Sequence, residues 1–454
     1  MLKKLAKEKS IKTELNMDRI KNFISLIADR FPSQVKSLIN KIFGLLDDEN
    51  VDDYTETANR LQDLENIALW LYITRRGHDQ DKPEIVQSGY HLMNNLIRLS
   101  EIIACTRLFT LCWETSDEIQ IYLANPFYKV QGGQAMTFII SFLLFILSLL
   151  REYILHLEDI GSSILLTYLR EIRQYGFDCK RLGLTEKQRK KFRVAFHIIL
   201  VNWYRLIQFN IYIVPAFIAA VHLVNPALSL DNPTFVFASF FWFLSESFCF
   251  IYVACGTFDI GAHIAVLVPL FIFKIESIIE LLERYLYNPK AIEPYLIRQL
   301  NIETIRLLNV LDVMSRDLRY LFAFLIVGIS FLADTFIFLG PILHIGSALH
   351  QSFFSFLGFF TLSAIGLITY AGGNIHGRLI IVHKIYTRLL TKEKVDFGTH
   401  SKAMEILDRI MGPFTGAKIG DFCTIDRYLF VFYIMENASM VMLLVCNAQS
   451  YINY

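Results

Sequence analysis

The feature that most constrains this chain is a series of long apolar blocks that carry almost no charge. One of them, AMTFIISFLLFILSLL (135–150), has no charged residue at all. About 20 apolar residues in a helix cross the hydrocarbon of a bilayer, because each residue advances the helix by 1.5 Å. Mean hydropathy is +0.40 and 54% of the residues are hydrophobic, against about 45–50% in soluble domains. We therefore expect a polytopic, all-α membrane protein.

Seven blocks are expected to span the membrane: 88–113, 132–157, 194–224, 233–280, 318–347, 352–383 and 425–448. The first is weak, because Arg98, Glu101 and Arg107 interrupt it. The fourth would be about 70 Å long as a helix, too long for one crossing. It is either one helix that continues into water or two spans hinged at Gly256–Gly261. In the sixth block, Gly372-Gly373 marks a hinge or close helix packing, and packing is favoured.

The placement of lysine and arginine orients the chain. With seven spans, four segments rich in these residues share one side of the membrane: 1–87, 158–193, 281–317 and 384–422. The other side holds 114–131, 225–232, 348–351 and the C-terminal tail, with Lys129 as their one basic residue. Basic loops stay in the cytosol. We therefore expect a cytosolic N-terminus, an extracellular C-terminus and one long fourth helix that extends into the cytosol, because two spans there would break this pattern.

Four regions follow from this organisation. Residues 1–87 form a cytosolic region in which 20–46 is amphipathic and packs on a domain or on a membrane surface. Residues 88–383 form the six-span region, 384–424 a cytosolic anchor segment, and 425–454 the last helix with a short extracellular tail. The whole chain is expected in the plasma membrane, in contact with lipid.

Composition excludes several other classes of function. The net charge of +1 gives no reason to expect a nucleic-acid partner. The seven cysteines are odd in number and lack zinc-ligand spacing with histidines, so we expect no metal and no disulfide framework. The histidines are dispersed and no His-Glu-x-x-His helix occurs, which argues against a membrane enzyme. No cofactor is expected.

The segment CTIDRYLFVFY (423–433) contains Asp426-Arg427-Tyr428, a triplet that suggests a G-protein-coupled receptor. Rhodopsin-like receptors have an external N-terminus and carry this triplet after the apolar run of their third span. Here it precedes the apolar run and opens the last span of a chain with the opposite orientation. A G protein is therefore not expected as a partner. Asp426 instead suits the N-terminus of a helix, where an acid is favourable.

The stretch FTGAKIGDFCTIDRYLF (414–430) resembles the C-terminal signature of the insect gustatory and odorant receptor superfamily. The loops LREIRQYGFDCKRLGLTEKQRKKFR (169–193) and FKIESIIELLERYLYNPK (273–290) are also similar to that superfamily. The last helix departs from it. Where the family has Thr-Tyr and Gln-Phe around five hydrophobic residues, this chain has Ser439-Met440 and Cys446-Asn447. The departure indicates a divergent, gustatory-receptor-like member.

The resemblance implies a homotetramer in which four last helices line a pore for cations. Glu436, Met440, Leu443 and Asn447 share one helical face, because they are spaced four, three and four residues apart. The resemblance places the constriction at Leu443 and Asn447, with Cys446 beside them. Rings of leucine gate by dewetting, and a ring of Glu436 carboxylates would favour cations. The alternative for Glu436 and Asn437 is hydrogen bonding to neighbouring helices.

A small-molecule site is expected in the outer halves of spans two to six. The polar or aromatic residues placed there are Thr137, Asn210, Tyr212, Trp242, Glu246, Asp334 and Thr335. If they have no function, Glu246 and Asp334 have the highest free-energy cost in the membrane, because their side chains are ionisable. For each of these residues, helix–helix hydrogen bonding is the alternative role.

The leading hypothesis is a chemosensory receptor that acts as a ligand-gated, non-selective cation channel, opened by a tastant or odorant. One alternative is an odorant receptor subunit that forms a heteromer with a co-receptor. Another is a secondary transporter, which predicts repeat symmetry between halves and broken helices at matching positions. No such repeat is visible in the sequence.

Overall fold

The computed structural model describes most of the chain. The described residues are 55–74, 77–78, 89–114, 116–130, 132–159, 164–225, 228, 233–287, 294–344, 348–392, 396–412 and 415–452. The amphipathic helix expected over 20–46 lies outside them. In chain order the elements are α4 (Thr55–Trp70), α5 (Tyr90–Trp113), α6 (Asp117–Tyr122), α7 (Gly133–Asp159), α8 (Ile164–Tyr175), α9 (Cys179–Leu182), α10 (Glu186–Leu223), α11 (Pro233–Phe250), η2 (Ile251–Cys255), α12 (Gly256–Tyr287), α13 (Pro294–Ala323), η4 (Phe324–Ile329), α14 (Ser330–Ile337), η5 (Phe338–Ile342), α15 (Ala348–Lys392), α16 (Phe397–Met411), β1 (Lys418–Ile419), β2 (Cys423–Thr424) and α17 (Arg427–Ile452). The η elements are short π-helical stretches: η2 and η4 lie inside longer helices, and η5 ends the helix that begins at Pro294.

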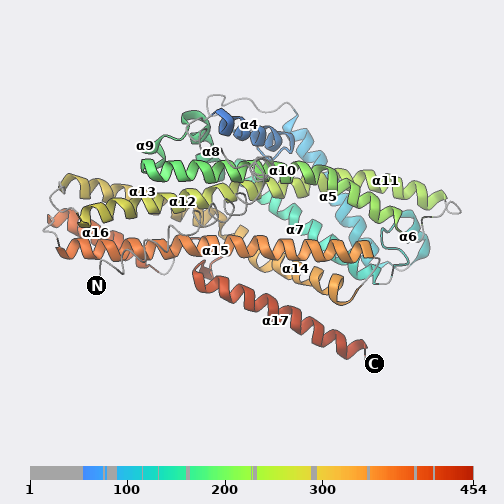
Figure 1. The fold of residues 1–454 in the computed structure, drawn as a ribbon. Coiled ribbons are helices and arrows are strands. Elements are labelled where there is room, and N and C mark those ends of the chain that lie inside the picture. Colours follow the sequence, from blue (N-terminus) through green and yellow to red (C-terminus); the bar gives the residue numbers. More distant parts are fainter. Residues whose placement is uncertain are drawn as a thin grey trace, which may run out of the picture.

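The long helices lie side by side along one axis and form an elongated bundle (Figure 1). One end, which we call the anchor end, contains α8, α9, α12, α13, α16 and the C-terminal part of α15. The opposite, outer end contains α5, α6, α7, α11, α14 and the N-terminal part of α15. The last helix, α17, leaves the bundle beside the middle of α15 and runs obliquely away from it.

Five helices in the described part of the chain are long and apolar enough to cross a membrane: Gly133–Leu157, Glu186–Leu223, Ile297–Ile342, Ala348–Thr391 and Arg427–Asn447. The protein is therefore a multi-pass membrane protein. These five correspond to the second, third, fifth, sixth and seventh expected spans. The first expected span corresponds to helix α5. It is not among the five, because Arg98, Glu101 and Arg107 make it more charged than they are. The total of seven spans and the orientation stay predictions.

The fourth apolar block forms one continuous helix. Helical residues run without a break from Pro233 through η2 to Tyr287, about 80 Å at 1.5 Å per residue. Both glycines of the alternative hinge lie inside this helix, at points of close packing. A Cβ on Gly256 would lie 3.0 Å from Ile73 Cδ1, and a Cβ on Gly261 would lie 3.0 Å from Trp203 Cη2. The glycines therefore allow close helix contacts, and the two-span alternative is wrong.

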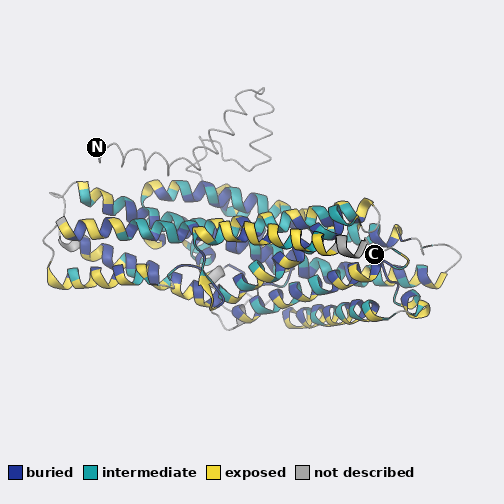
Figure 2. Cartoon of the chain, turned by 90° about the horizontal axis from the view of Figure 1, so that it is seen from below, coloured by how far each residue is buried: buried dark blue, intermediate teal, exposed yellow. Residues whose placement is uncertain are grey.

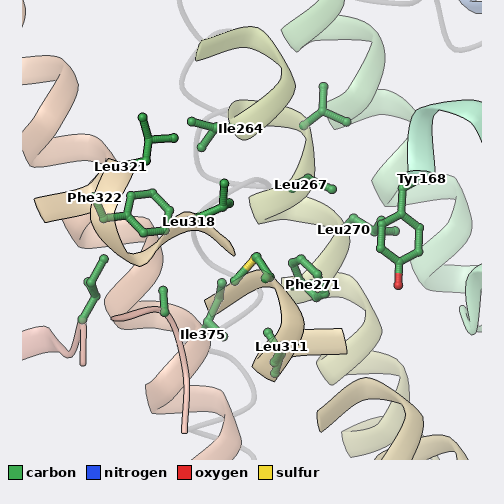
Figure 3. Close-up of a cluster of buried hydrophobic side chains, with 14 of the residues drawn as sticks. Tyr168, Ile264, Leu267, Leu270, Phe271, Leu311, Leu318, Leu321, Phe322 and Ile375 are labelled. Atoms are coloured by element: carbon green, nitrogen blue, oxygen red, sulfur yellow. The ribbon is translucent and has the colours of Figure 1, made fainter. Parts of the chain in front are cut away.

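The helices of the anchor end pack around a hydrophobic core, part of which is shown in Figure 3. Leu267 and Phe271 from α12 meet Leu311 and Leu318 from α13, with Ile375 of α15 beside them. All five side chains are buried. Full burial of one such side chain stabilises a fold by about 1.5–3 kcal/mol. This packing makes the anchor end a rigid support for the segment that leads into α17.

Candidate functional site

The start of α17 is fixed by a side-chain cap. Asp426 Oδ1 accepts a hydrogen bond of 2.7 Å from the backbone N–H of Leu429. This bond satisfies one of the four N–H groups that a helix leaves unpaired at its N-terminus. Just before it, β1 and β2 form a two-stranded antiparallel hairpin. The N–H of Gly420 in the hairpin donates to Arg319 O of α13 at 2.8 Å, so the entry to α17 is tied to the anchor end.

Three glycines of α15 form the surface on which α17 begins. A Cβ on Gly372 would lie 2.9 Å from Ile425 Cγ2, and a Cβ on Gly373 would lie 2.7 Å from Asp426 O. One turn later, a Cβ on Gly377 would lie 3.0 Å from Arg427 Nε. Real Cβ atoms do not approach neighbours below 3.0 Å. The Gly372-Gly373 pair is therefore a packing site, as favoured from the sequence.

Beyond its start, α17 contacts the bundle along one narrow face. Tyr433 and Asn437, one turn apart, are the buried polar residues of this face. The Asn437 side chain donates to Tyr433 O within the same helix at 2.6 Å, so its amide bonds to its own helix. Most of the helix is exposed in the single chain (Figure 2). In the most apolar stretch of this helix, 11% of the residues are buried.

The predicted pore face lies largely on this exposed surface. Glu436, Leu443, Cys446 and Asn447 are exposed in the single chain, and Met440 is half-buried. The Leu443 side chain is 57% exposed. Glu436 lies about 14 Å along the axis from the first residue of α17, which is close to half of the hydrocarbon thickness of about 30 Å. The Glu436 carboxylate therefore lies near mid-membrane depth, on the surface of the single chain.

Two of the predicted ligand residues, Trp242 and Glu246, lie together at the outer end and share one partner, Arg107 of α5. Arg107 forms a buried ion pair with Glu246, and its guanidinium lies 4.5 Å from the centre of the Trp242 ring. His222 Nε2 lies 3.1 Å from the other oxygen of Glu246. Arg107 Nε donates to Leu123 O and Arg107 Nη2 donates to Ala124 O, both at 2.8 Å. Glu246 is therefore held by structural partners.

Thr137 belongs to a second buried network at the same end of the bundle. Its hydroxyl lies 2.8 Å from Gly133 O and 3.4 Å from Asn125 Oδ1. Asn225 Nδ2 donates to Asn125 O at 3.0 Å, and Asn125 Nδ2 donates to Gln120 at 2.6 Å. These bonds fasten the loop that contains α6 to the ends of α7 and α10.

The other four predicted ligand residues are dispersed. Asn210 and Thr335 bond to carbonyls of their own helices, Leu206 O at 2.7 Å and Phe331 O at 2.8 Å. The Tyr212 side chain is 76% exposed. Asp334 is buried, and its Oδ1 has no hydrogen-bond partner within the described part of the chain. The seven residues therefore do not line one common cavity in this conformation, and their binding role stays a prediction.

Sequence reasoning did not select the partners that organise the outer end. Arg107, His222, Asn125 and Asn225 are all buried there, yet none was among the candidate residues. One signal was available, because Arg107 interrupts the first apolar block. A charged residue at membrane depth requires a partner, and Glu246 was one of the acids placed in a span. The asparagines gave no comparable signal.

Two solved structures have a fold similar to that of this chain. No family model matches this chain, and no curated protein matches its sequence. The chain is similar in structure to the insect olfactory receptor OR5 from Machilis hrabei, with a TM-score of 0.61 and 10% identity over 87% of this chain and 99% of that chain. It is also similar to the complex of that receptor with eugenol, with a TM-score of 0.59, 12% identity and the same coverage. The helical bundle described above is thus the fold of an insect olfactory receptor.

Proposed function

We propose that this protein is a chemosensory receptor and that it acts as a ligand-gated, non-selective cation channel. The shared fold with an insect olfactory receptor supports the receptor class. The eugenol complex of that receptor supports a small-molecule ligand. In our proposal four copies assemble around one axis, and their α17 helices line the pore.

The position of Glu436 carries this proposal. An exposed carboxylate halfway along a span costs about 2.5–3.5 kcal/mol or more in lipid, so it should face protein or water. The described part of its own chain leaves it exposed. Four copies of α17 around an axis would give each carboxylate an aqueous environment and would form an acidic ring that attracts cations.

The gate is proposed about two to three turns further out. Leu443 and Asn447 follow Glu436 on the same face, so they point toward the same axis. Four leucine side chains close a narrow pore by excluding water, and four asparagine amides provide its polar mouth. Ligand binding in the outer half of the bundle would favour the state in which the α17 helices stand apart.

The anchor end is proposed to hold the subunits together on the cytosolic side. It contains the inner parts of α12, α13 and α15 together with α16, and the hairpin β1–β2 connects it to α17. This arrangement requires the cytosolic N-terminus, the extracellular C-terminus and the seven spans predicted from the basic loops. The gustatory branch is proposed from TIDR (424–427), and an odorant receptor subunit that requires a co-receptor is the alternative.

The experiment is expression of the full chain in cultured cells, followed by patch-clamp recording during application of tastants and odorants. A current carried by Na⁺ and K⁺ alike, together with fourfold particles by electron imaging, supports the proposal. Current that appears only with a co-expressed partner receptor selects the co-receptor alternative. A C-terminal tag should be stained on intact cells. Absence of current under every condition, combined with a monomeric particle, would refute the channel.

A further inference from the structure

Asp334 of α14 is a buried acid in the membrane-spanning part of the bundle. The residue is 2% exposed, and its Oδ1 accepts no hydrogen bond within the described part of the chain. No charged side chain among the described residues acts on it. An ionisable side chain at membrane depth is costly without a partner, and it usually marks a function. A donor for Asp334 is therefore expected in another conformation of the molecule.

The helix that carries Asp334 is fixed on one side, against α15. A Cβ on Gly358 of α15 would lie 2.8 Å from Ala333 O in α14. Just beyond α14, a Cβ on Gly340 would lie 2.9 Å from Gln351 O in α15. Because there is no room for even one methyl group at these points, α14 and α15 cannot slide past each other without clashes. A change that brings a donor to Asp334 must therefore move a different neighbour, α17.

Helix α17 packs on α14 and runs in the same direction, away from the anchor end (Figure 1). The two helices meet at Ser330 and Tyr433, and α17 also contacts η5, which follows α14. Asp334 lies one helical turn beyond Ser330, and Asn437 lies one turn beyond Tyr433. Because both helices advance together, Asp334 and Asn437 lie at the same level of the interface.

Asn437 can supply the donor that Asp334 lacks. Its side-chain amide carries two N–H groups, and one of them donates to Tyr433 O at 2.6 Å. Within the described residues, the other N–H has no acceptor. Asn437 is 9% exposed, on the face of α17 that packs on the bundle. The Asp334 carboxyl is also close enough to the Tyr433 hydroxyl to act on it electrostatically, so it lies near this face of α17.

The contact between α14 and α17 is loose in this conformation. Ser330 Oγ and the Tyr433 hydroxyl are 3.4 Å apart, whereas hydrogen bonds between hydroxyl groups usually measure about 2.5–3.0 Å. A closer approach of α17 would strengthen this bond, and it would carry Asn437 toward Asp334. Few contacts within the chain oppose such a movement, because most of α17 is exposed.

We propose that α17 has a second position, closer to α14, in which Asn437 Nδ2 donates to Asp334 Oδ1. The inference rests on the proposed function of α17 as the pore helix. The predicted pore face lies largely on the exposed surface of α17, so a helix that moves toward its own α14 withdraws from the pore axis. The second position is then the open state, and Asp334 is a positioning residue that stabilises it. A carboxylate is a strong acceptor for this purpose.

The first part of the test asks whether the two side chains meet, and it requires no current. Asn437→Asp in the full chain places two carboxyl groups at one level, so the melting temperature in detergent should fall. Adding Asp334→Asn restores one amide and one carboxyl with exchanged roles, and it should recover about half of the loss or more. Ala438→Asp is the matched control, because Ala438 points about 100° away around α17 and is exposed. Asp334→Asn should not recover its loss. If Asn437→Asp cannot be purified, the yields of the two double variants are compared.

The second part asks whether the pair favours the open pore. Leu443→Asn, which is expected to conduct without any ligand, provides the background. In it, Asp334→Asn should lower the standing current about tenfold at equal surface expression, because a charge-assisted bond of the open state is replaced by a weaker one. Adding Asn437→Asp should restore the current, and adding Ala438→Asp should not. A purely structural role of Asp334 would not produce this rescue.

The outcomes separate this inference from the proposed channel. No recovery of the melting temperature by the exchanged pair would overturn the inference, whatever the current. Equal standing currents with and without Asp334→Asn would overturn it as well. Recovery of the melting temperature, combined with no current from any Leu443→Asn protein at the cell surface, would support the pairing and contradict the pore.

Discussion

Tyr433 of α17 joins two helices of the bundle through a single hydroxyl. Ser330 Oγ of α14 donates to this hydroxyl at 3.4 Å, and the hydroxyl donates to Leu362 O of α15 at 3.2 Å. The Tyr433 side chain is buried, at 6% exposure, in a helix that is otherwise mostly exposed. This hydroxyl is therefore an important connection between the proposed pore helix and the helices that surround the proposed ligand region.

The first prediction concerns this hydroxyl. Tyr433→Phe keeps the ring and removes both hydrogen bonds, so we expect a loss of about 0.6–1.7 kcal/mol in the packing of α17. The measurement is the melting temperature of the purified protein in detergent. Tyr428→Phe is the matched control, because Tyr428 lies in the same helix and is 83% exposed. An equal melting temperature for Tyr433→Phe and the parent would show that the hydroxyl does not hold α17.

A second prediction concerns the glycine surface beneath the start of α17. Gly373→Ala places a methyl group 2.7 Å from the backbone O of Asp426. Backbone atoms must then move, at a cost of about 1–3 kcal/mol. Gly366→Ala in the same helix is the control, since its Cβ would lie 3.6 Å from the nearest atom. Surface expression should fall for Gly373→Ala alone; a normal level for this variant would contradict the packing role.

The third prediction concerns the buried ion pair of the outer end. Glu246→Gln leaves the Arg107 guanidinium buried without its countercharge, so the protein should lose about 3–5 kcal/mol. The exposed pair Arg60–Asp63, with atoms 3.3 Å apart, should contribute less than about 1 kcal/mol. Surface expression and thermal stability are the measurements. Arg107→Leu combined with Glu246→Leu should recover part of the loss, and a double variant worse than Glu246→Gln would contradict this explanation.

A fourth prediction concerns pH and a buried histidine that precedes α5. His78 Nε2 lies 3.3 Å from His263 Nε2, and the backbone N–H of His78 donates to Glu65 Oε1 at 2.7 Å. Burial lowers the pKa of His78 well below its usual value, and the nearby charges lower it further. The charged or titratable groups near His78 are His263, Asp259, Glu65, Arg170 and Arg173.

The sign of the pH effect follows from this shift. Below about pH 6.5 the unfolded chain takes up a proton on His78, and the folded chain does not. The contribution of His78 to the free energy of unfolding is therefore complete above that pH. It decreases as the pH falls below it, by at most about 1.4 kcal/mol for each pH unit. The protection factors of the α4 amides, which are corrected for the intrinsic exchange rate at each pH, should therefore fall from pH 7 to pH 5. His78→Gln should remove part of this dependence, and His91→Gln, at an exposed position, should not; identical profiles for both would contradict the role of His78.

Local signals made the helices predictable. The apolar blocks indicated the spans, the basic loops favoured one long fourth helix, and Asp426 before an apolar run indicated a helix start. Each of these depends on residues that are neighbours in sequence. Gly372-Gly373 likewise indicated close packing, because a glycine pair in a span leaves room for another backbone.

Contacts between distant segments could not be predicted in the same way. Arg107 and Glu246 are 139 residues apart, and no spacing rule connects two residues on different helices. Helical periodicity identified the face of Glu436 and Leu443, but periodicity does not say which face packs on the bundle. Polar residues such as Asn210 and Thr335 satisfy their own helix, so polarity in a span alone was a weak guide to a ligand site.

The central claim is that α17 lines a pore with a hydrophobic gate at Leu443. The most direct measurement is the current in the absence of any ligand when Leu443 is replaced by asparagine. Water should then enter the constriction, so Leu443→Asn should produce a standing cation current. Val445→Asn, two residues further and about 200° around the helix, should produce none. Leu443→Asn protein at the cell surface with no more current than Val445→Asn would contradict the account.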